Sequence, residues 1–136
     1  MTLAFDTNVF VDLIQGRKPI IRRRRDKVIL ARETVVASLI VYHELQFGVA
    51  ASRDPAGEAL NVADVLEGVA IEPLSEEDVI VAARVRAVLK RQGASIGPYD
   101  GLIAGQALAR GWTLVTSNVR EFSRVEGLDV QDWSQP

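Results

Sequence analysis

The sequence contains no cysteine and a single histidine, His43, among its 136 residues. The lack of cysteine excludes disulfides, thiolate metal ligands and a cysteine nucleophile. A lone histidine gives little support to a Ser-His-Asp triad or a multi-histidine zinc site, and we interpret His43 as structural. No apolar run approaches the roughly 20 residues of a membrane span, and the first residues lack the pattern of a signal peptide. We therefore expect a cytoplasmic protein without membrane contact.

Lysine is also scarce, with three lysines against 13 arginines. The net charge of −2 argues against a general surface for polyanions, but Arg22, Arg23, Arg24 and Arg25 form one continuous basic block. Guanidinium groups suit bidentate contacts with phosphates or carboxylates. The block is therefore either a solvated helix face or a contact for RNA or for an acidic segment of a partner.

The length and hydrophobicity fit one compact domain over residues 1–136, because 48% of the residues are hydrophobic and the mean hydropathy is +0.10. Hydrophobic periodicity predicts strands that alternate with helices. The alternation predicts an α/β fold with three layers, α/β/α, around a short and mostly parallel sheet of four to five strands. The expected strands are 3–5, 34–37, 69–71, 113–116 and, more weakly, 128–130; the expected helices are 8–14, 20–32, 39–51, 55–67, 76–91 and 99–110.

Three carboxylates occupy positions that deserve an explanation. Asp6 directly follows the first strand, where α/β sheets bind ligands, although it is also suited to cap the next helix. Glu44 shares an apolar helical stripe with Phe47, so it needs a partner if buried and none if that stripe is exposed. Asp100 lies in the first turn of a helix, where it also interacts favourably with the helix dipole.

The predicted fold brings these acids toward one end of the sheet. Thr116 and Asn118 follow the strand 113–116 and add a hydroxyl and an amide there, although both are also common turn residues. Converging carboxylates repel one another unless a cation lies between them. Mg²⁺ and Mn²⁺ prefer carboxylate oxygens and retained waters. The pattern therefore indicates a divalent-metal site.

Four motifs carry a family resemblance. They are DTNVFVDL from Asp6, the SxxxxxEL element from Ser38 through Glu44, YDGLIAGQAL around Asp100, and TSNVREFSRVEGLDVQDW from Thr116. In this order and spacing they resemble the PIN-domain ribonucleases, and specifically the VapC-type toxins of bacterial toxin–antitoxin pairs. The resemblance covers nearly the whole chain.

The resemblance implies a Mg²⁺- or Mn²⁺-dependent endoribonuclease that hydrolyses RNA through a metal-activated water and so inhibits translation or growth. It assigns Asp6, Glu44 and Asp100 as catalytic metal ligands. It also implies a homodimer and a cognate antitoxin that occupies a groove near the active site. The helix with the arginine block and its apolar residues Ile20, Ile21, Val28, Ile29 and Leu30 forms part of that groove or belongs to the ordinary core.

The resemblance further assigns supporting roles. Asn8 orients Asp6 through a hydrogen bond, and Ser38 and Thr116 support the same pocket. Asn118 stands where many family members carry a fourth acid, and its amide supplies no charge for a second metal ion.

Two other functions are compatible with the same residues. An aspartyl-phosphate phosphotransfer domain also places a nucleophilic aspartate after a strand, but none of Lys18, Lys27 and Lys90 follows a strand, as such sites require. A non-catalytic RNA- or protein-binding module with a degenerate site is the second alternative.

Overall fold

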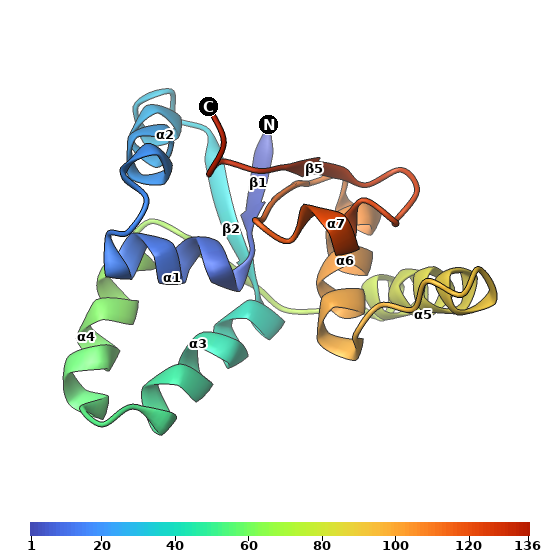
Figure 1. Ribbon diagram of the computed structural model, residues 1–136, viewed down its shortest axis with the longest axis horizontal. Helices are drawn as coiled ribbons and strands as arrows, with labels where there is room; N and C mark the ends of the chain where they lie inside the picture. The colour runs from blue at the N-terminus through green and yellow to red at the C-terminus, as the bar shows by residue number, and fades with distance from the viewer.

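The computed structural model describes residues Met1–Pro136, with a sheet of five strands in the order β3-β2-β1-β4-β5 at its centre (Figure 1). All four strand pairings are parallel. The central strand β1 has Leu3, Ala4 and Phe5 buried, as expected of a parallel strand covered on both faces. The strands are β1 (Thr2–Phe5), β2 (Thr34–Ser38), β3 (Ala70–Glu72), β4 (Thr113–Val115) and β5 (Asp129–Gln131).

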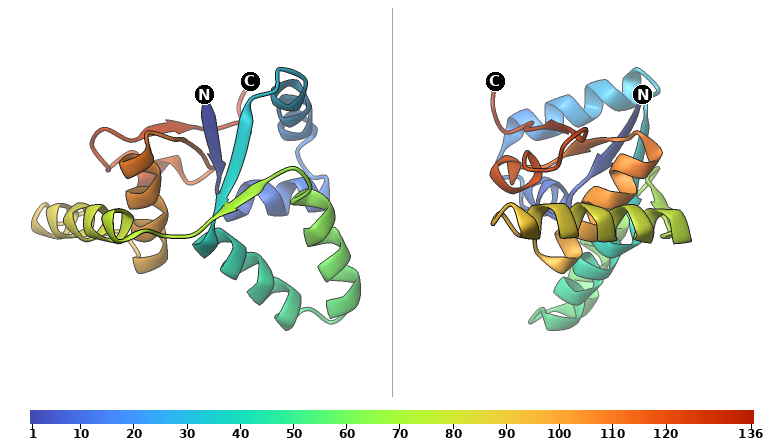
Figure 2. Two further views of the ribbon diagram at one scale, coloured as in Figure 1. Left: turned by 180° about the vertical axis from the view of Figure 1, so that it is seen from behind. Right: turned by 90° about the vertical axis from the view of Figure 1, so that its right-hand side faces the viewer.

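Seven helices accompany the sheet. In the two opposite views, α1, α2 and α4 lie to one side of β1 and β2, and α5 and α6 lie to the other (Figures 1 and 2). The predicted three-layer α/β fold with a parallel sheet is confirmed. The helices are α1 (Thr7–Gln15), α2 (Pro19–Leu30), α3 (Leu39–Ala51), α4 (Pro55–Val65), α5 (Glu76–Arg91), α6 (Pro98–Arg110) and α7 (Val119–Phe122). None of them combines the length and the hydrophobicity needed to span a bilayer.

Helix α3 buries only part of its apolar surface. The residues of α3 that are buried are Val41 and Leu45, whereas Phe47, on the stripe of Glu44, is 68% exposed. Helix α3 runs away from the sheet beyond its first turns (Figure 1), and Ile40 and Val49 are only partly buried against the core. The apolar composition of α3 therefore does not indicate burial of Glu44.

Helix α6, which carries Asp100, packs very closely against α5. A Cβ atom on Gly105 would overlap with the backbone and side chain of Ala82 in α5. A glycine is therefore needed at this crossing. The close packing fixes the position of α6 beside the sheet.

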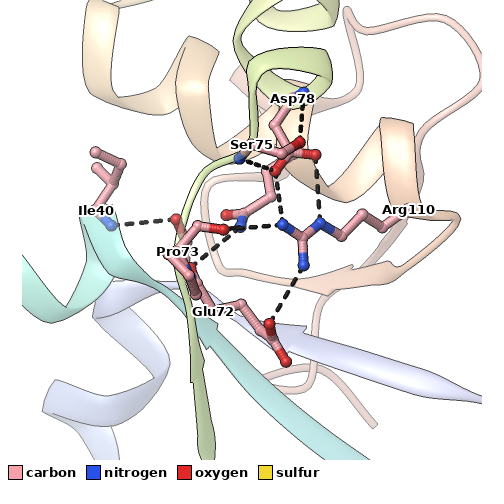
Figure 3. A network of polar contacts seen from close by, with 8 residues as sticks. Ile40, Glu72, Pro73, Ser75, Asp78 and Arg110 are labelled. Atoms are coloured by element: carbon pink, nitrogen blue, oxygen red, sulfur yellow. Dashed lines mark hydrogen bonds and ion pairs between the residues drawn. The ribbon is translucent and has the colours of Figure 1, made fainter.

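A polar network fixes the other end of α6 (Figure 3). The Arg110 guanidinium donates to Asp78 Oδ2 at 2.7 Å and to the Pro73 carbonyl at 2.8 Å. Gln106 Nε2 also donates to the Pro73 carbonyl, at 3.2 Å. Burial opposes ionisation of Asp78, but hydrogen bonds from Arg110 and Ser75 outweigh it and hold the Asp78 pKa below its usual value. The network ties α6 to the start of α5 and to the loop before it.

Candidate active site

The site lies at the carboxyl end of β1, and Asp6 is its most constrained residue. Asp6 caps α1 and accepts a hydrogen bond from the Thr7 N–H at 2.8 Å. Its other oxygen, Oδ2, accepts from Thr116 Oγ1 at 2.8 Å and from Asn8 Nδ2 at 3.1 Å. Asp6 is only 5% exposed. Both carboxylate oxygens are thus held by donors from the ends of two neighbouring strands, β1 and β4.

Glu44 and Asp100 come from separate helices. Glu44, on α3, accepts from Thr7 Oγ1 at 2.8 Å, so Thr7 connects it to the helix that Asp6 caps. Asp100 belongs to the first turn of α6. One cavity of about 430 Å³ brings the three acids together, and its lining consists of Asp6, Thr7, Asn8, Val11, Asp12, Arg17, Glu44, Asp100 and Asn118.

The acids in this cavity disfavour one another's ionisation. Burial raises the pKa of Asp6, with a further contribution from the charge of Glu44, although hydrogen bonds from Thr116 and Thr7 oppose the shift. Burial and the charges of Glu121, Asp6 and Glu44 raise the pKa of Asp100 to about 7. A proton or a cation near Asp100 therefore relieves an unfavourable electrostatic energy.

Glu121 is an acidic residue of the site that the sequence analysis missed. Burial opposes its ionisation, but hydrogen bonds from the Asn118 amide at 2.8 Å, from the Gly97 N–H at 3.1 Å and from Asp100 outweigh it and lower its pKa. Glu121 follows Asn118 by three residues, which is about one helical turn. Glu121 thus adds an acid beside Asp100 without lining the cavity itself, whereas Asn118 does line it. That the Asn118 amide supplies no charge for a second metal ion stays a prediction. The available signal was the acid in the VREF segment.

Ser38, Thr116 and His43 do not line the cavity themselves. The Ser38 hydroxyl accepts from the Ile40 N–H at 3.1 Å and caps α3, which carries Glu44. Thr116 is fully buried, donates to Asp6 and accepts from the Asn118 N–H at 3.0 Å. His43 is exposed, and its ring packs edge-on against Tyr99 at 5.7 Å between ring centroids.

None of the four residues of the arginine block lines the acidic cavity; Arg17 does so instead. Arg22 donates to the Leu13 carbonyl at 2.9 Å, and Arg25 pairs with Asp26 at 3.1 Å.

The apolar residues of the same helix serve two purposes. Ile21 is buried, and Ile20 and Val28 pack against the core. Ile29 and Leu30 are 56% and 83% exposed. The core interpretation is therefore correct for one part of α2, and the other part remains free for a partner.

The chemistry of the cavity fits a hydrated divalent cation. No three acidic groups converge closely enough to hold a metal ion by themselves. Mg²⁺ does not need such a cage, because it is usually bound by one or two carboxylates and keeps several waters. Asp6, Glu44 and Asp100 line an open cavity with room for these waters. Their mutual repulsion supplies a reason for a cation to bind there.

Comparison with known proteins agrees with this architecture. The PIN domain family matches residues 3–128, so the chain belongs to the PIN-domain family. Within it, the chain is 33% identical over 128 residues to the "tRNA(fMet)-specific endonuclease VapC" of Salmonella typhimurium, covering 94% of this chain and 95% of that one. It is 32% identical to "Ribonuclease VapC1" of Haemophilus influenzae (strain R2866) over 135 residues, covering 99% and 100% of the two chains.

Solved structures extend the similarity to three dimensions. The chain superposes on VapBC2 from Rickettsia felis, bound to a DNA fragment of its promoter, with a TM-score of 0.90 and 28% identity, covering 96% of this chain and 98% of that one. The chain and its VapC relatives therefore share the whole fold, including the elements that carry the acidic cavity.

Proposed function

We propose that the chain is a Mg²⁺- or Mn²⁺-dependent endoribonuclease and the toxin of a toxin–antitoxin pair. The observation that carries the proposal is that Asp6, Glu44 and Asp100, from three separate parts of the fold, line one open cavity of a chain that matches a VapC ribonuclease over 99% of its residues. Hydrolysis by water gives products with 5′-phosphate and 3′-hydroxyl ends, because the 2′-hydroxyl takes no part.

The residues of the cavity have distinct roles in this proposal. Asp6, Glu44 and Asp100 would hold the cation, and a cation bound there would supply Lewis-acid activation of a water and charge neutralisation at the scissile phosphate. Thr116 and Asn8 keep the Asp6 carboxylate in one orientation, and Thr7 does the same for Glu44. Asp100, with its pKa of about 7, releases its proton when a cation takes the proton's place.

Cleavage of purified RNA tests the proposal. The name of the Salmonella relative makes tRNA(fMet) the first substrate to try. We expect cleavage with Mg²⁺ or Mn²⁺, none with EDTA, and a loss of about 100-fold or more in Asp6→Asn, Glu44→Gln and Asp100→Asn, because each removes charge that stabilises the transition state. The matched control is Asp64→Asn, an exposed acid on α4. Unchanged cleavage by all three site variants would refute the assignment.

The same proposal gives the chain two protein partners, a second copy of itself and a cognate antitoxin. The similar structures from Rickettsia felis and Salmonella typhimurium are VapBC assemblies bound to DNA. The chain offers apolar side chains for such contacts, with Val79, Ile80 and Val88 exposed on α5 and Leu30 on α2. Light scattering on the isolated chain should give twice the 14.9 kDa of one copy, and a monomer would contradict the dimer.

A further inference from the structure

A second hollow adjoins the acidic cavity where the chain passes from α1 to α2. It has a volume of about 320 Å³, and the charged residues of its lining are Asp12, Lys18, Arg22, Arg23 and Asp26. Asp12 lines both hollows, so they lie next to each other on either side of that residue. Arg17, on the same connection, lines the acidic cavity itself. A chain molecule lying in one hollow can therefore continue into the other.

The acids of this second hollow are already neutralised. Lys18 Nζ lies 3.3 Å from Asp12 Oδ2, and Arg25 lies 3.1 Å from Asp26 Oδ1. Both carboxylates that line the hollow thus have a cationic partner, and neither partner is Arg22 or Arg23.

Three guanidinium groups remain without a counter-charge. Arg17, Arg22 and Arg23 have no carboxylate oxygen within 4.0 Å. Arg22 donates to the Leu13 carbonyl at 2.9 Å, which holds its guanidinium beside the end of α1 without neutralising it. Arg17 and Arg23 are exposed. Uncompensated positive charge therefore borders the acidic cavity on this side, although the chain as a whole carries a net charge of −2.

We propose that Arg17, Arg22 and Arg23 form a phosphate track, which binds the backbone of a single-stranded RNA segment beside the phosphate held in the acidic cavity. This inference rests on the proposed endoribonuclease function. When one phosphate of an RNA strand lies in the cavity, the neighbouring phosphates of that strand must lie at the edge of the cavity. Guanidinium groups bind phosphates bidentately, and a positive groove that follows the backbone is typical of single-strand binding.

The composition of the hollow favours RNA over an acidic peptide. Apart from Leu13 and Pro19, its side chains are charged. Protein interfaces depend on apolar or aromatic anchors at their centre, whereas phosphate contacts do not. The hollow around Arg25 is the opposite case, because Phe10, Ile29 and Val65 also line it. The structure thus separates Arg22 and Arg23 from Arg25 within one basic block.

Salt-dependent RNA binding tests the track. We would measure anisotropy of a fluorescein-labelled oligouridylate in EDTA, so that no cleavage interferes, and plot log Kd against log salt concentration. Each phosphate contact to a single strand contributes about 0.7 to the slope. Arg17→Gln and Arg23→Gln should each weaken binding and lower the slope by about 0.7, with the double variant losing about 1.4. Arg91→Gln is the matched control and should bind as the parent does, because Arg91 is exposed on α5, away from the hollow, and has no carboxylate partner. Circular dichroism melting checks that all variants fold.

The outcomes separate the track from its alternatives. Parent-like slopes for Arg17→Gln and Arg23→Gln would overturn it, and so would an equal loss in Arg91→Gln, which would indicate only general charge attraction. If these variants keep the RNA slope but lose the complex with the cognate antitoxin, the surface is a protein contact and the track is wrong. Because the binding is measured without divalent cations, a chain that shows the expected slopes yet never cleaves RNA retains the track and loses the nuclease assignment.

Discussion

At the scale of single residues, Asp100 and Glu121 form the most strongly interacting pair of the site. Asp100 belongs to α6 and Glu121 to α7; burial and the charge of Glu121 raise the pKa of Asp100 to about 7 while the pKa of Glu121 is lowered, so the pair keeps one proton below that pH. The proton stays on Asp100, because the Asn118 amide and the Gly97 N–H stabilise the negative charge of Glu121. Without a cation, Asp100 therefore keeps its proton up to a higher pH in the folded chain than in the unfolded chain.

This proton predicts a pH dependence of stability. The pKa of Asp100 is about 7 in the folded state and 3.8 ordinarily, so the folded protein binds more protons between these values. The stabilisation that protonated Asp100 gives to the folded state is present in full below about pH 4 and is lost as the pH rises through about 7. In EDTA, the parent should melt at a lower temperature at about pH 8 than at about pH 5, and Asp100→Asn should remove much of that difference.

Differential scanning calorimetry in EDTA measures both curves. Glu121→Gln is the companion variant, because it removes the neighbouring charge that raises the pKa of Asp100 and should flatten the curve in the same way. Asp78, with its pKa shifted downward, affects stability only at more acidic pH and does not disturb the comparison. Parallel melting curves for the parent and Asp100→Asn would contradict the shared proton.

At the scale of secondary structure, the crossing of α5 and α6 determines where Asp100 lies. Gly105→Ala should lower the free energy of unfolding by about 1–3 kcal/mol, because the added methyl overlaps with Ala82 and forces the helices apart. Cleavage should fall as well, since Asp100 moves with α6. Gly48→Ala on α3 is the control, because no atom lies within 4 Å of its added Cβ; it should stabilise the fold by about 0.5–1 kcal/mol. Urea denaturation measures both, and equal effects would contradict the tight crossing.

The helices and strands also show how much of the fold and of the site can be predicted from the sequence. Hydrophobic periodicity, together with the capping and turn residues between the segments, predicted all five strands and α1 to α6, with bounds that differ from the structure by at most two residues. Helix α7 has four residues, too few for any period, so Glu121 could not be placed beside Asp100. Whether the stripe of Phe47 is buried or exposed could not be decided, because composition does not say which face of α3 meets another element. The three carboxylates were identified from motif order, whereas their hydrogen-bond partners depend on tertiary contacts.

At the scale of the whole molecule, the acidic cavity exists only when distant parts of the chain come together. Asp6 precedes Glu44 by 38 residues and Asp100 by 94 in the sequence, and the fold places all three around one cavity. The repulsion among them makes the folded state less stable than its packing alone would allow. A ligand that neutralises them should consequently act on the stability of the entire fold.

Manganese should therefore raise the melting temperature of the parent. A ligand that binds only the folded state stabilises it by about 2.7 kcal/mol at 100 times its dissociation constant. Asp100→Asn should gain much less from Mn²⁺, because it offers one ligand fewer and has less repulsion to relieve. Asp64→Asn, which changes an exposed acid outside the cavity, should gain as much as the parent. Scanning fluorimetry at constant ionic strength separates specific binding from screening by salt. An equal rise in all three proteins would show that the ion acts on the general surface, and the acidic cavity would then not be its site.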